Sequence, residues 1–260
     1  MTPTTKAVFF DLDDTLCAYW AASRLGLRLT FDEHELPGGT DAAIRAWRSV
    51  FTSFSPEIKT DRWYQRYLES GEATRTEHMR RMLETLGAPN DAVAARLSAR
   101  YAELRDINLE AFPETYACLD FLEPRYVMGL ITNGPADVQR QEIATLDIEK
   151  YFDHVLIEGE LRIGKPHQQV FDEAAKRCGV EPESMLFVGN AFEHDVQGAK
   201  NAGWQAIWLN RAAEPNPGGE PQPDATVDNL WGVVDWLGLH RPPFASDPAV
   251  NAESVRNWRS

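Results

Sequence analysis

Positive charge is scarce in this sequence. Lys and Arg total 26 against 40 Asp and Glu, which gives a formal net charge of -14. A surface this acidic repels the phosphates of nucleic acids and of anionic membranes, so binding to either is disfavoured as the main function. It also repels a free anionic substrate, and any phosphate site must therefore be built from a few local positive groups.

Cysteines and long apolar runs are also few. The three cysteines Cys17, Cys118 and Cys178 are scattered without metal-ligand spacing, which indicates reduced thiols in a cytoplasmic protein. The apolar run that ends at Phe10 is too short for the core of a signal peptide. Since no apolar stretch approaches ~20 residues, we expect no membrane span.

Apolar residues recur with helical spacing between residues 18 and 107. One such face holds Ile44, Trp47, Phe51 and Phe54, and similar faces recur around Met79 and Val93. This period predicts a compact bundle of four or five helices.

After residue 113, short apolar runs alternate with helical segments. Strands are expected at 126–131, 154–157, 185–188 and 205–209, with helices between them at 135–146, 167–178 and 193–202. This alternation predicts an α/β protein with a parallel, doubly wound sheet.

A further buried strand, residues 6–10, has no partner nearby in sequence, so we assign it to the same sheet. The predicted organisation is a discontinuous core (1–17 and 108–245), an inserted helical bundle (18–107) and a loosely held tail (246–260). Within the core, the Pro- and Gly-rich stretch 213–223 is predicted to be a loop, and 228–239 a helix.

Polar residues follow the first four strands of the predicted sheet. In open parallel sheets, ligands bind outside the carboxyl ends of the strands. The four groups are therefore expected at one edge, and they are Asp11, Asp13 and Thr15; Thr132, Asn133 and Gly134; Lys165; and Asn190 with Asp195.

These residue types suit phosphoryl transfer. One carboxylate of the pair Asp11 and Asp13 can attack phosphorus while the other moves protons. Attack by a carboxylate on a phosphate dianion brings like charges together, and Mg²⁺ with Lys165 would offset that repulsion. Thr132 offers a hydroxyl, and Asn133 and Gly134 offer backbone N–H groups at a helix start.

Four segments resemble the motifs of the haloacid dehalogenase superfamily in order and spacing. They are FFDLDDTL, LITNG, GKP and VGNAFEHD, and the resemblance covers nearly the whole chain. It implies a Rossmann-like core with a helical cap inserted between the first two motifs, and a reaction through an aspartyl-phosphate.

The resemblance also implies roles for individual residues. Asp11 would be the nucleophile and Asp13 the general acid and base, with Thr15 orienting Asp13. Thr132 would bind the phosphoryl group, and Lys165 would steady both the nucleophile and the phosphate. The metal ligands would be Asp11 and the backbone carbonyl of Asp13, completed by the fourth motif.

The fourth motif departs from the family pattern at Asn190, where an aspartate that binds Mg²⁺ is usual. An asparagine carbonyl can bind a metal but brings no charge. We therefore expect Asn190 to remain a ligand and Asp195 to supply the missing carboxylate, directly or through water.

The leading hypothesis is a cytoplasmic, Mg²⁺-dependent phosphatase, monomeric or homodimeric, acting on a small phosphorylated metabolite. One alternative is a 2-haloacid dehalogenase, which attacks carbon without a metal; that branch resembles DxYGT and lacks a second aspartate such as Asp13. Others are a catalytically weak binding or regulatory protein, and a mutase.

Substrate selection is expected in the cap. The stretch 71–76 is predicted to be a loop before a cap helix, and Arg75, Arg80 and Arg81 could meet a substrate carboxylate or a second phosphate. We interpret all three as exposed arginines in surface ion pairs.

Overall fold

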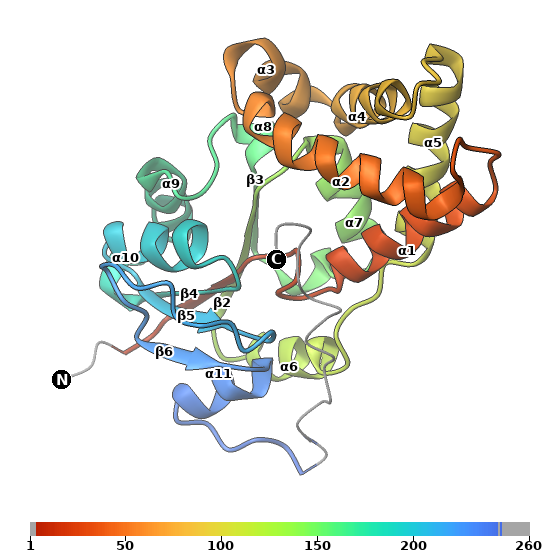
Figure 1. The fold of residues 1–260 in the computed structure, drawn as a ribbon. Coiled ribbons are helices and arrows are strands. Elements are labelled where there is room, and N and C mark those ends of the chain that lie inside the picture. The colour runs from red at the N-terminus through yellow and green to blue at the C-terminus, as the bar shows by residue number, and fades with distance from the viewer. Residues whose placement is uncertain (1–3, 244, 246–260) are drawn as a thin grey trace.

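A parallel sheet of six strands forms the centre of the molecule (Figure 1). The computed structural model describes residues 4–243 and 245, so the predicted tail 246–260 lies outside the described residues. The strand order is β3-β2-β1-β4-β5-β6. The strands are β1 (Ala7–Phe10), β2 (Val127–Thr132), β3 (His154–Ile157), β4 (Met185–Gly189), β5 (Gln205–Leu209) and β6 (Ala225–Val227).

The chain builds this sheet outward from β1 in two directions. It passes through β2 and β3 on one side, and through β4, β5 and β6 on the other. The order therefore reverses between β1 and β4, and the crevice at such a reversal is where doubly wound folds bind ligands. The backbone N–H of Asp11 donates to the carbonyl of Val188 (3.0 Å), which extends the β1–β4 pairing into this crevice.

Helices cover both faces of the sheet because side chains alternate along each strand. Val8 and Phe10 of β1 pack with α6 (Thr115–Leu122), α7 (Ala136–Thr145) and α11 (Leu230–Trp236). Ala7 and Phe9 face α9 (Gln168–Cys178), the π-helical turn η3 (Phe192–Gln197) and α10 (Gly198–Asn201). The remaining short helices of this part are η1 (Glu149–Tyr151), α8 (Glu158–Leu161) and η2 (Pro182–Ser184). The prediction of a doubly wound α/β core is confirmed.

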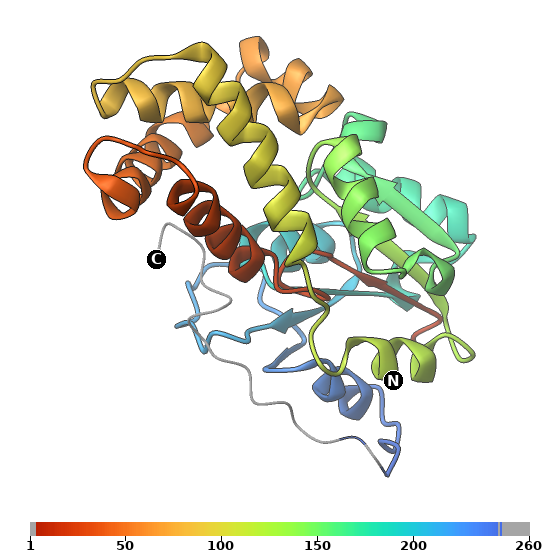
Figure 2. The same cartoon turned by 90° about the vertical axis from the view of Figure 1, so that its right-hand side faces the viewer.

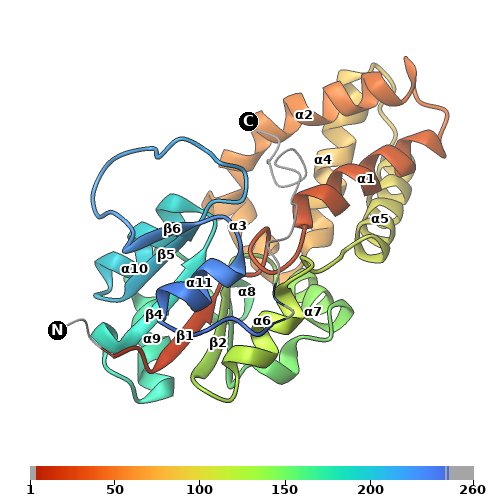
Figure 3. The same cartoon turned by 90° about the horizontal axis from the view of Figure 1, so that it is seen from below.

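Of the six helices between β1 and β2 in the chain, five lie within the predicted range 18–107. They are α1 (Tyr19–Asp32), α2 (Gly39–Ile58), α3 (Asp61–Glu69), α4 (Gly71–Thr85) and α5 (Asp91–Ile107). They gather on one side of the sheet (Figures 1, 2 and 3). Leu27, Trp47 and Met79 belong to an apolar cluster that these helices form among themselves. We call this part the insertion and the rest the core.

The structure differs from the sequence predictions in three places. Residues 71–76 begin helix α4 instead of forming a loop, because the Ser70 side chain accepts a hydrogen bond from the N–H of Glu72 and starts the helix. Helix α6 and strand β6 were not predicted. Strand β6 has only three residues and pairs with β5 alone, so its sequence carries little period-2 signal.

Candidate active site

Three charged side chains from distant parts of the core meet at the carboxyl end of β1. Lys165 Nζ lies 2.6 Å from Asp11 Oδ1 and 2.7 Å from Asp195 Oδ1. Only 5% of Lys165 and 1% of Asp195 is exposed, so both ion pairs are shielded from water. The fold thus brings together the ends of the first and fourth predicted strands and the lysine of the third group.

The loop after β1 turns sharply at Asp14, whose φ is +58°. Aspartate is among the few residues that adopt this left-handed conformation readily. The Asp14 N–H donates to the carbonyl of Cys17 (2.9 Å), and its carboxylate accepts from the N–H of Trp20 at the start of α1. The turn leads the chain from the loop after β1 into the insertion and leaves Asp13 close to Asp11.

Residues after β2 fix the lysine and the second aspartate. Asn133 holds the backbone of Lys165 from both sides, donating through Nδ2 to its carbonyl (2.7 Å) and accepting at Oδ1 from its N–H (2.8 Å). The Thr132 hydroxyl donates to Gln139 Oε1, and Gln139 Nε2 donates to Asp13 Oδ2 (3.4 Å). The predicted group is therefore connected to both Lys165 and Asp13.

Thr15 was predicted to orient Asp13, but its side chain lies against Asp11. Its hydroxyl donates to Asp11 Oδ2 (3.2 Å) and also lies 3.4 Å from Asn190 Oδ1. The reason is the turn at Asp14, which separates the side chains of Asp13 and Thr15. Asp11 and Asn190 thus meet across one hydroxyl.

Asp195 lies directly over the end of β4. Its Oδ2 accepts from the N–H of Ala191 (2.8 Å), and a Cβ on Gly189 would approach Oδ2 to 2.3 Å. The Asp195 carboxylate can therefore occupy this position only because residue 189 is a glycine. With Lys165 on the other oxygen, both oxygens of Asp195 have protein partners.

Burial is the main cause of the pKa shifts of Asp11 and Asp13, the two aspartates of the loop after β1 that were predicted to be catalytic. It raises the pKa of Asp11 to about 6, although the Lys165 charge opposes this shift. Burial, reinforced by the Asp11 charge, raises the pKa of Asp13 to about 7. Burial also raises the pKa of Glu142, on α7, well above its usual range. For Lys165, burial lowers the pKa, but the carboxylates of Asp11 and Asp195 outweigh it and raise the value.

Oxygen atoms suited to a hard cation converge beside Asp11. Asp11 Oδ2 and Asn190 Oδ1 flank the Thr15 hydroxyl, and Asp13 Oδ1 is buried without a hydrogen-bond partner. Within residues 4–243 and 245, however, no three His, Cys, Asp or Glu side chains are arranged to hold a metal ion. A cation here would need amide or backbone oxygens as well as carboxylates.

The sequence analysis missed several residues that support the site. Gln139 and Glu142 lie one helical turn apart on α7 and are linked by a hydrogen bond of 2.9 Å. Arg211, after β5, donates to the carbonyl of Thr15 (3.0 Å) and pairs with Glu114 (2.7 Å) inside the core. Arg211 could have been found from its position in the sequence, because it follows the predicted strand 205–209 as the other site residues follow theirs.

A cavity of about 750 Å³ separates the core from the insertion beside Asp13. We call its two sides the floor and the roof. The floor consists of core residues, including Asp13, Asn133, Gly134, Pro135, Val138 and Gln139. The roof consists of residues of the insertion, including Trp20, Trp47, Phe51, Tyr67, Arg75 and His78.

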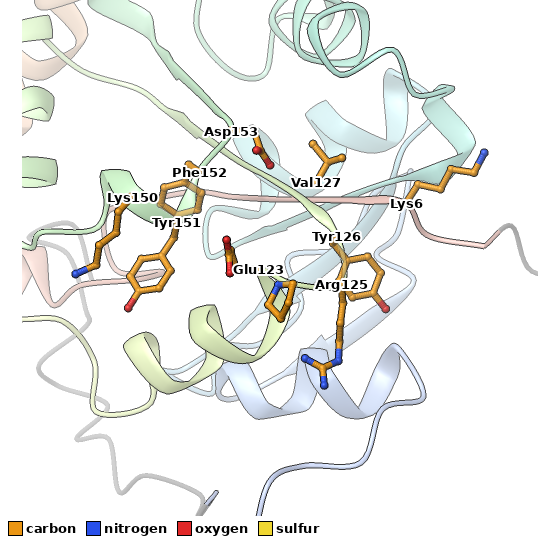
Figure 4. A pocket seen from close by; sticks show the side chains of 10 residues that line it. Lys6, Glu123, Arg125, Tyr126, Val127, Lys150, Tyr151, Phe152 and Asp153 are labelled. Carbon is orange, nitrogen blue, oxygen red and sulfur yellow. The ribbon is translucent and has the colours of Figure 1, made fainter.

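A second hollow, of about 410 Å³, lies at the opposite end of the strands. Its charged residues are of both signs, and Figure 4 shows Lys6, Arg125 and Lys150 extending away from one another. The Asp153 carboxylate there is used by the backbone N–H of Met128 (3.0 Å). These groups do not converge on one point, so we place the candidate active site at the cavity beside Asp13.

No helix within the described part of the chain is both long and apolar enough to cross a membrane.

Comparison with known proteins agrees with this geometry. A family model described as "haloacid dehalogenase-like hydrolase" matches residues 5–203. The chain is 30% identical over 209 residues to glyceraldehyde 3-phosphate phosphatase of Methanothermobacter thermautotrophicus, a match covering 79% of this chain and 85% of the relative.

Two solved structures resemble the fold. YfnB of Bacillus subtilis, a haloacid dehalogenase-type hydrolase bound to magnesium, has a TM-score of 0.73 at 20% identity, covering 90% of this chain and 99% of the other. A 2-haloacid dehalogenase of Pseudomonas syringae pv. Tomato DC3000 has a TM-score of 0.63 at 28% identity, covering 90% and 98%.

The buried Asp–Lys–Asp arrangement lies where the strand order of the sheet reverses. The protein belongs to the haloacid dehalogenase-like hydrolase family, as the sequence motifs predicted.

Proposed function

We propose that this protein is a magnesium-dependent phosphatase that hydrolyses a small phosphate monoester through an aspartyl-phosphate intermediate. The observation that supports this most is the pairing of two carboxyl groups with different surroundings. Asp11 is held by Lys165, whereas Asp13 faces the cavity with one oxygen free of hydrogen bonds. Two such groups can divide the roles of nucleophile and proton carrier.

In the first step, an oxygen of Asp11 attacks phosphorus and the bond from phosphorus to the substrate's alcohol oxygen breaks. Asp13 gives its proton to that oxygen as it leaves. A pKa of about 7 suits this task, because a group poised near the working pH can both give and take a proton. Lys165 keeps Asp11 oriented and places a positive charge beside the phosphoryl oxygens.

In the second step, water attacks the phosphorus of the aspartyl-phosphate, and Asp13 accepts a proton from that water. The bond between phosphorus and the Asp11 oxygen breaks, which restores the carboxylate and releases inorganic phosphate. The sum is one ester and one water converted to one alcohol and one phosphate. The roof limits access of other water to the intermediate.

Asp11, the backbone carbonyl of Asp13 and Asn190 are the proposed ligands of Mg²⁺. When bound, the ion would neutralise charge on the phosphoryl oxygens and draw the two anions together. The convergence of Asp11 Oδ2 and Asn190 Oδ1 on the Thr15 hydroxyl supports two of these three ligands. Asp195 was also predicted as a ligand; since both its oxygens are engaged, we propose that it contributes through water or through its charge.

Dehalogenation is the second candidate, because a 2-haloacid dehalogenase is among the similar structures and Asn190 brings no charge to the site. Asp13 distinguishes the two reactions. Displacement of halide needs no proton donor for the leaving group, whereas an alcohol leaving phosphorus does. The presence of Asp13 beside Asp11 therefore favours phosphate esters.

Hydrolysis of p-nitrophenyl phosphate with Mg²⁺, with EDTA and by Asp11→Asn tests the proposal. We expect turnover that EDTA removes and that Asp11→Asn lowers at least about 1,000-fold, since the nucleophile is lost. Glu193→Gln, which changes an exposed acid near the site, serves as the control. Turnover of 2-chloropropionate but not of phosphate esters would replace the proposal with the dehalogenase.

The proposed partner is a small phosphorylated metabolite, in keeping with the size of the cavity beside Asp13. A cytoplasmic location and a monomeric or homodimeric state remain predictions from the sequence.

A further inference from the structure

Arg75 differs from the two other arginines of helix α4 that the sequence analysis singled out. Arg80 pairs with Glu77 and Glu84, and Arg81 pairs with Glu57 and Glu77. Both arginines are half-buried rather than exposed, with 34% of the Arg80 side chain and 25% of the Arg81 side chain accessible. Arg75 is also half-buried, but it lines the cavity and has no ion-pair partner among residues 4–243 and 245.

The surroundings of Arg75 hold its guanidinium near the floor. Its Nε donates to the backbone carbonyl of Ser98 on α5 (3.3 Å). Gly71 lies beside it, and a Cβ on Gly71 would approach Arg75 Nη1 to 3.2 Å and Pro135 Cγ to 3.5 Å. Arg75 and Pro135 thus approach the same point, which places a roof arginine next to the loop that follows β2.

Within the described part of the chain, the ionisable groups near Arg75 form no ion pair with it. Asp137 attracts Arg75, but its oxygens accept from the Ser70 hydroxyl (2.8 Å) and from the N–H of Gly71 (3.0 Å). Arg105, also on the roof side, has its own carboxylate in Asp106 (2.6 Å), and its charge adds to that of Arg75. A half-buried guanidinium with unused donors favours an anion from outside the chain.

Part of the roof is aromatic. Trp47 stacks on Phe51 (ring centroids 5.2 Å apart) and on His78 (4.3 Å), and Trp20 meets Phe51 edge to face (5.8 Å). These rings are held by one another, so their remaining surface is a preformed apolar wall. At about 750 Å³, the cavity is large enough for a ligand of many atoms beyond the phosphate.

Resting on the phosphatase function proposed above, we infer that the substrate's alcohol part carries a flat apolar body and a second anionic group, a carboxylate, which Arg75 binds. The phosphate lies at the floor beside Asp13, and the alcohol extends from it into the cavity between the aromatic wall and Arg75. Specificity then depends on a bidentate contact from the roof, while the floor performs the reaction on the phosphate.

Two matched phosphate esters separate charge from shape. 4-Carboxyphenyl phosphate and 4-carbamoylphenyl phosphate are nearly the same size, and only the first has a second anion; the 3-substituted pair covers a different direction. For the wild-type protein with Mg²⁺, we expect kcat/KM to be about 10- to 100-fold higher for the carboxylate in at least one pair, the range of a charge-assisted hydrogen bond.

Variants of helix α4 then locate the source of the preference. Arg75→Gln should remove the preference by lowering kcat/KM about 10- to 100-fold more for the carboxylate than for the carbamoyl ester, and Arg75→Lys should retain part of it. Arg81→Gln, on the same helix but paired with Glu57 and Glu77 and not part of the cavity lining, should leave the preference unchanged. Melting temperatures show whether each variant folds.

The outcomes are distinguishable. Equal rates on the members of both pairs, with p-nitrophenyl phosphate still hydrolysed, overturn the inference but not the phosphatase. A preference that survives Arg75→Gln overturns the role of Arg75. Failure to hydrolyse any of the five esters overturns the proposed function itself. If Arg75→Gln does not fold, the wild-type ratio and Arg75→Lys still decide the question.

Discussion

The floor and the roof of the cavity differ in whether their polar side chains have partners within the protein. Near the floor, Lys165 is shared by two carboxylates, Asp195 has partners on both oxygens, and Thr132 donates to Gln139. In the roof, the Arg75 guanidinium makes one hydrogen bond, to a backbone carbonyl, amid aromatic rings. With the exception of Asp13 Oδ1, the groups near the floor already satisfy one another, whereas the roof offers an unpaired charge and apolar surface.

This difference suggests how the two parts divide the work. A preorganised set of charges suits a reaction common to all phosphate esters, because its groups need not rearrange during catalysis. A roof with unsatisfied groups suits selection among esters, because only a substrate that supplies the missing partner gains from them. The two parts also have separate apolar clusters, so one can change without repacking the other.

The largest expected effect is on the floor. Lys165→Met should leave two carboxylates buried without their counter-charge, which costs about 3–5 kcal/mol of unfolding free energy. Phosphatase activity should fall at least about 1,000-fold. Urea unfolding and p-nitrophenyl phosphate hydrolysis measure the two effects. Lys176→Met changes an exposed lysine and is the control. If Lys165→Met changed stability and activity as little as the control does, the proposed role of Lys165 would be contradicted.

A pH-dependent effect is expected in the roof. Burial lowers the pKa of His78 from 6.5 to about 4, so the folded protein keeps this ring neutral. As pH falls from 6.5 to 4, the unfolded chain takes up a proton that the folded chain does not. The His78 contribution to the unfolding free energy therefore declines over this window, by about 3 kcal/mol in total.

His78→Phe should remove this component while preserving the stack on Trp47. Urea unfolding at pH 6.5 and at pH 4.5 measures it: the variant's stability relative to wild type should rise as the pH falls. His167→Phe, at an exposed position, is the control. A stability difference between His78→Phe and wild type that is the same at both pH values would show that the folded ring takes up a proton as readily as the unfolded one.

The smallest expected effect joins the two parts. Asp137, in the first turn of α7, accepts from the Ser70 hydroxyl and the N–H of Gly71 at the start of α4. Asp137→Ala should cost about 1 kcal/mol, as loss of a helix cap does, and should raise hydrogen exchange in the first turn of α4. Asp137→Asn keeps an acceptor oxygen and should cost less. Unchanged exchange in Asp137→Ala would mean that α4 is held by other contacts.

The sequence alone predicted five strands of a parallel sheet and the polar residues that meet at its edge. Strand and helix periods predicted five of the six strands, because buried parallel strands are short apolar runs. The motifs named Asp11, Asp13, Lys165 and Asp195 since each follows a strand at the binding edge. Only the tertiary structure decided which of these side chains touch one another. The Thr15 hydroxyl donates to Asp11, and Lys165 lies between the carboxylates of Asp11 and Asp195.

The three arginines of α4 show why. Arg75, Arg80 and Arg81 look alike in sequence, because each carries the same side chain on the same helix. Their difference depends on which residues of other helices face them, and such pairings are set by how α4 packs on α5 and on the core. Local sequence fixes a residue's secondary structure and chemistry; whether its charge is paired or left for a ligand is decided by residues far away in the chain.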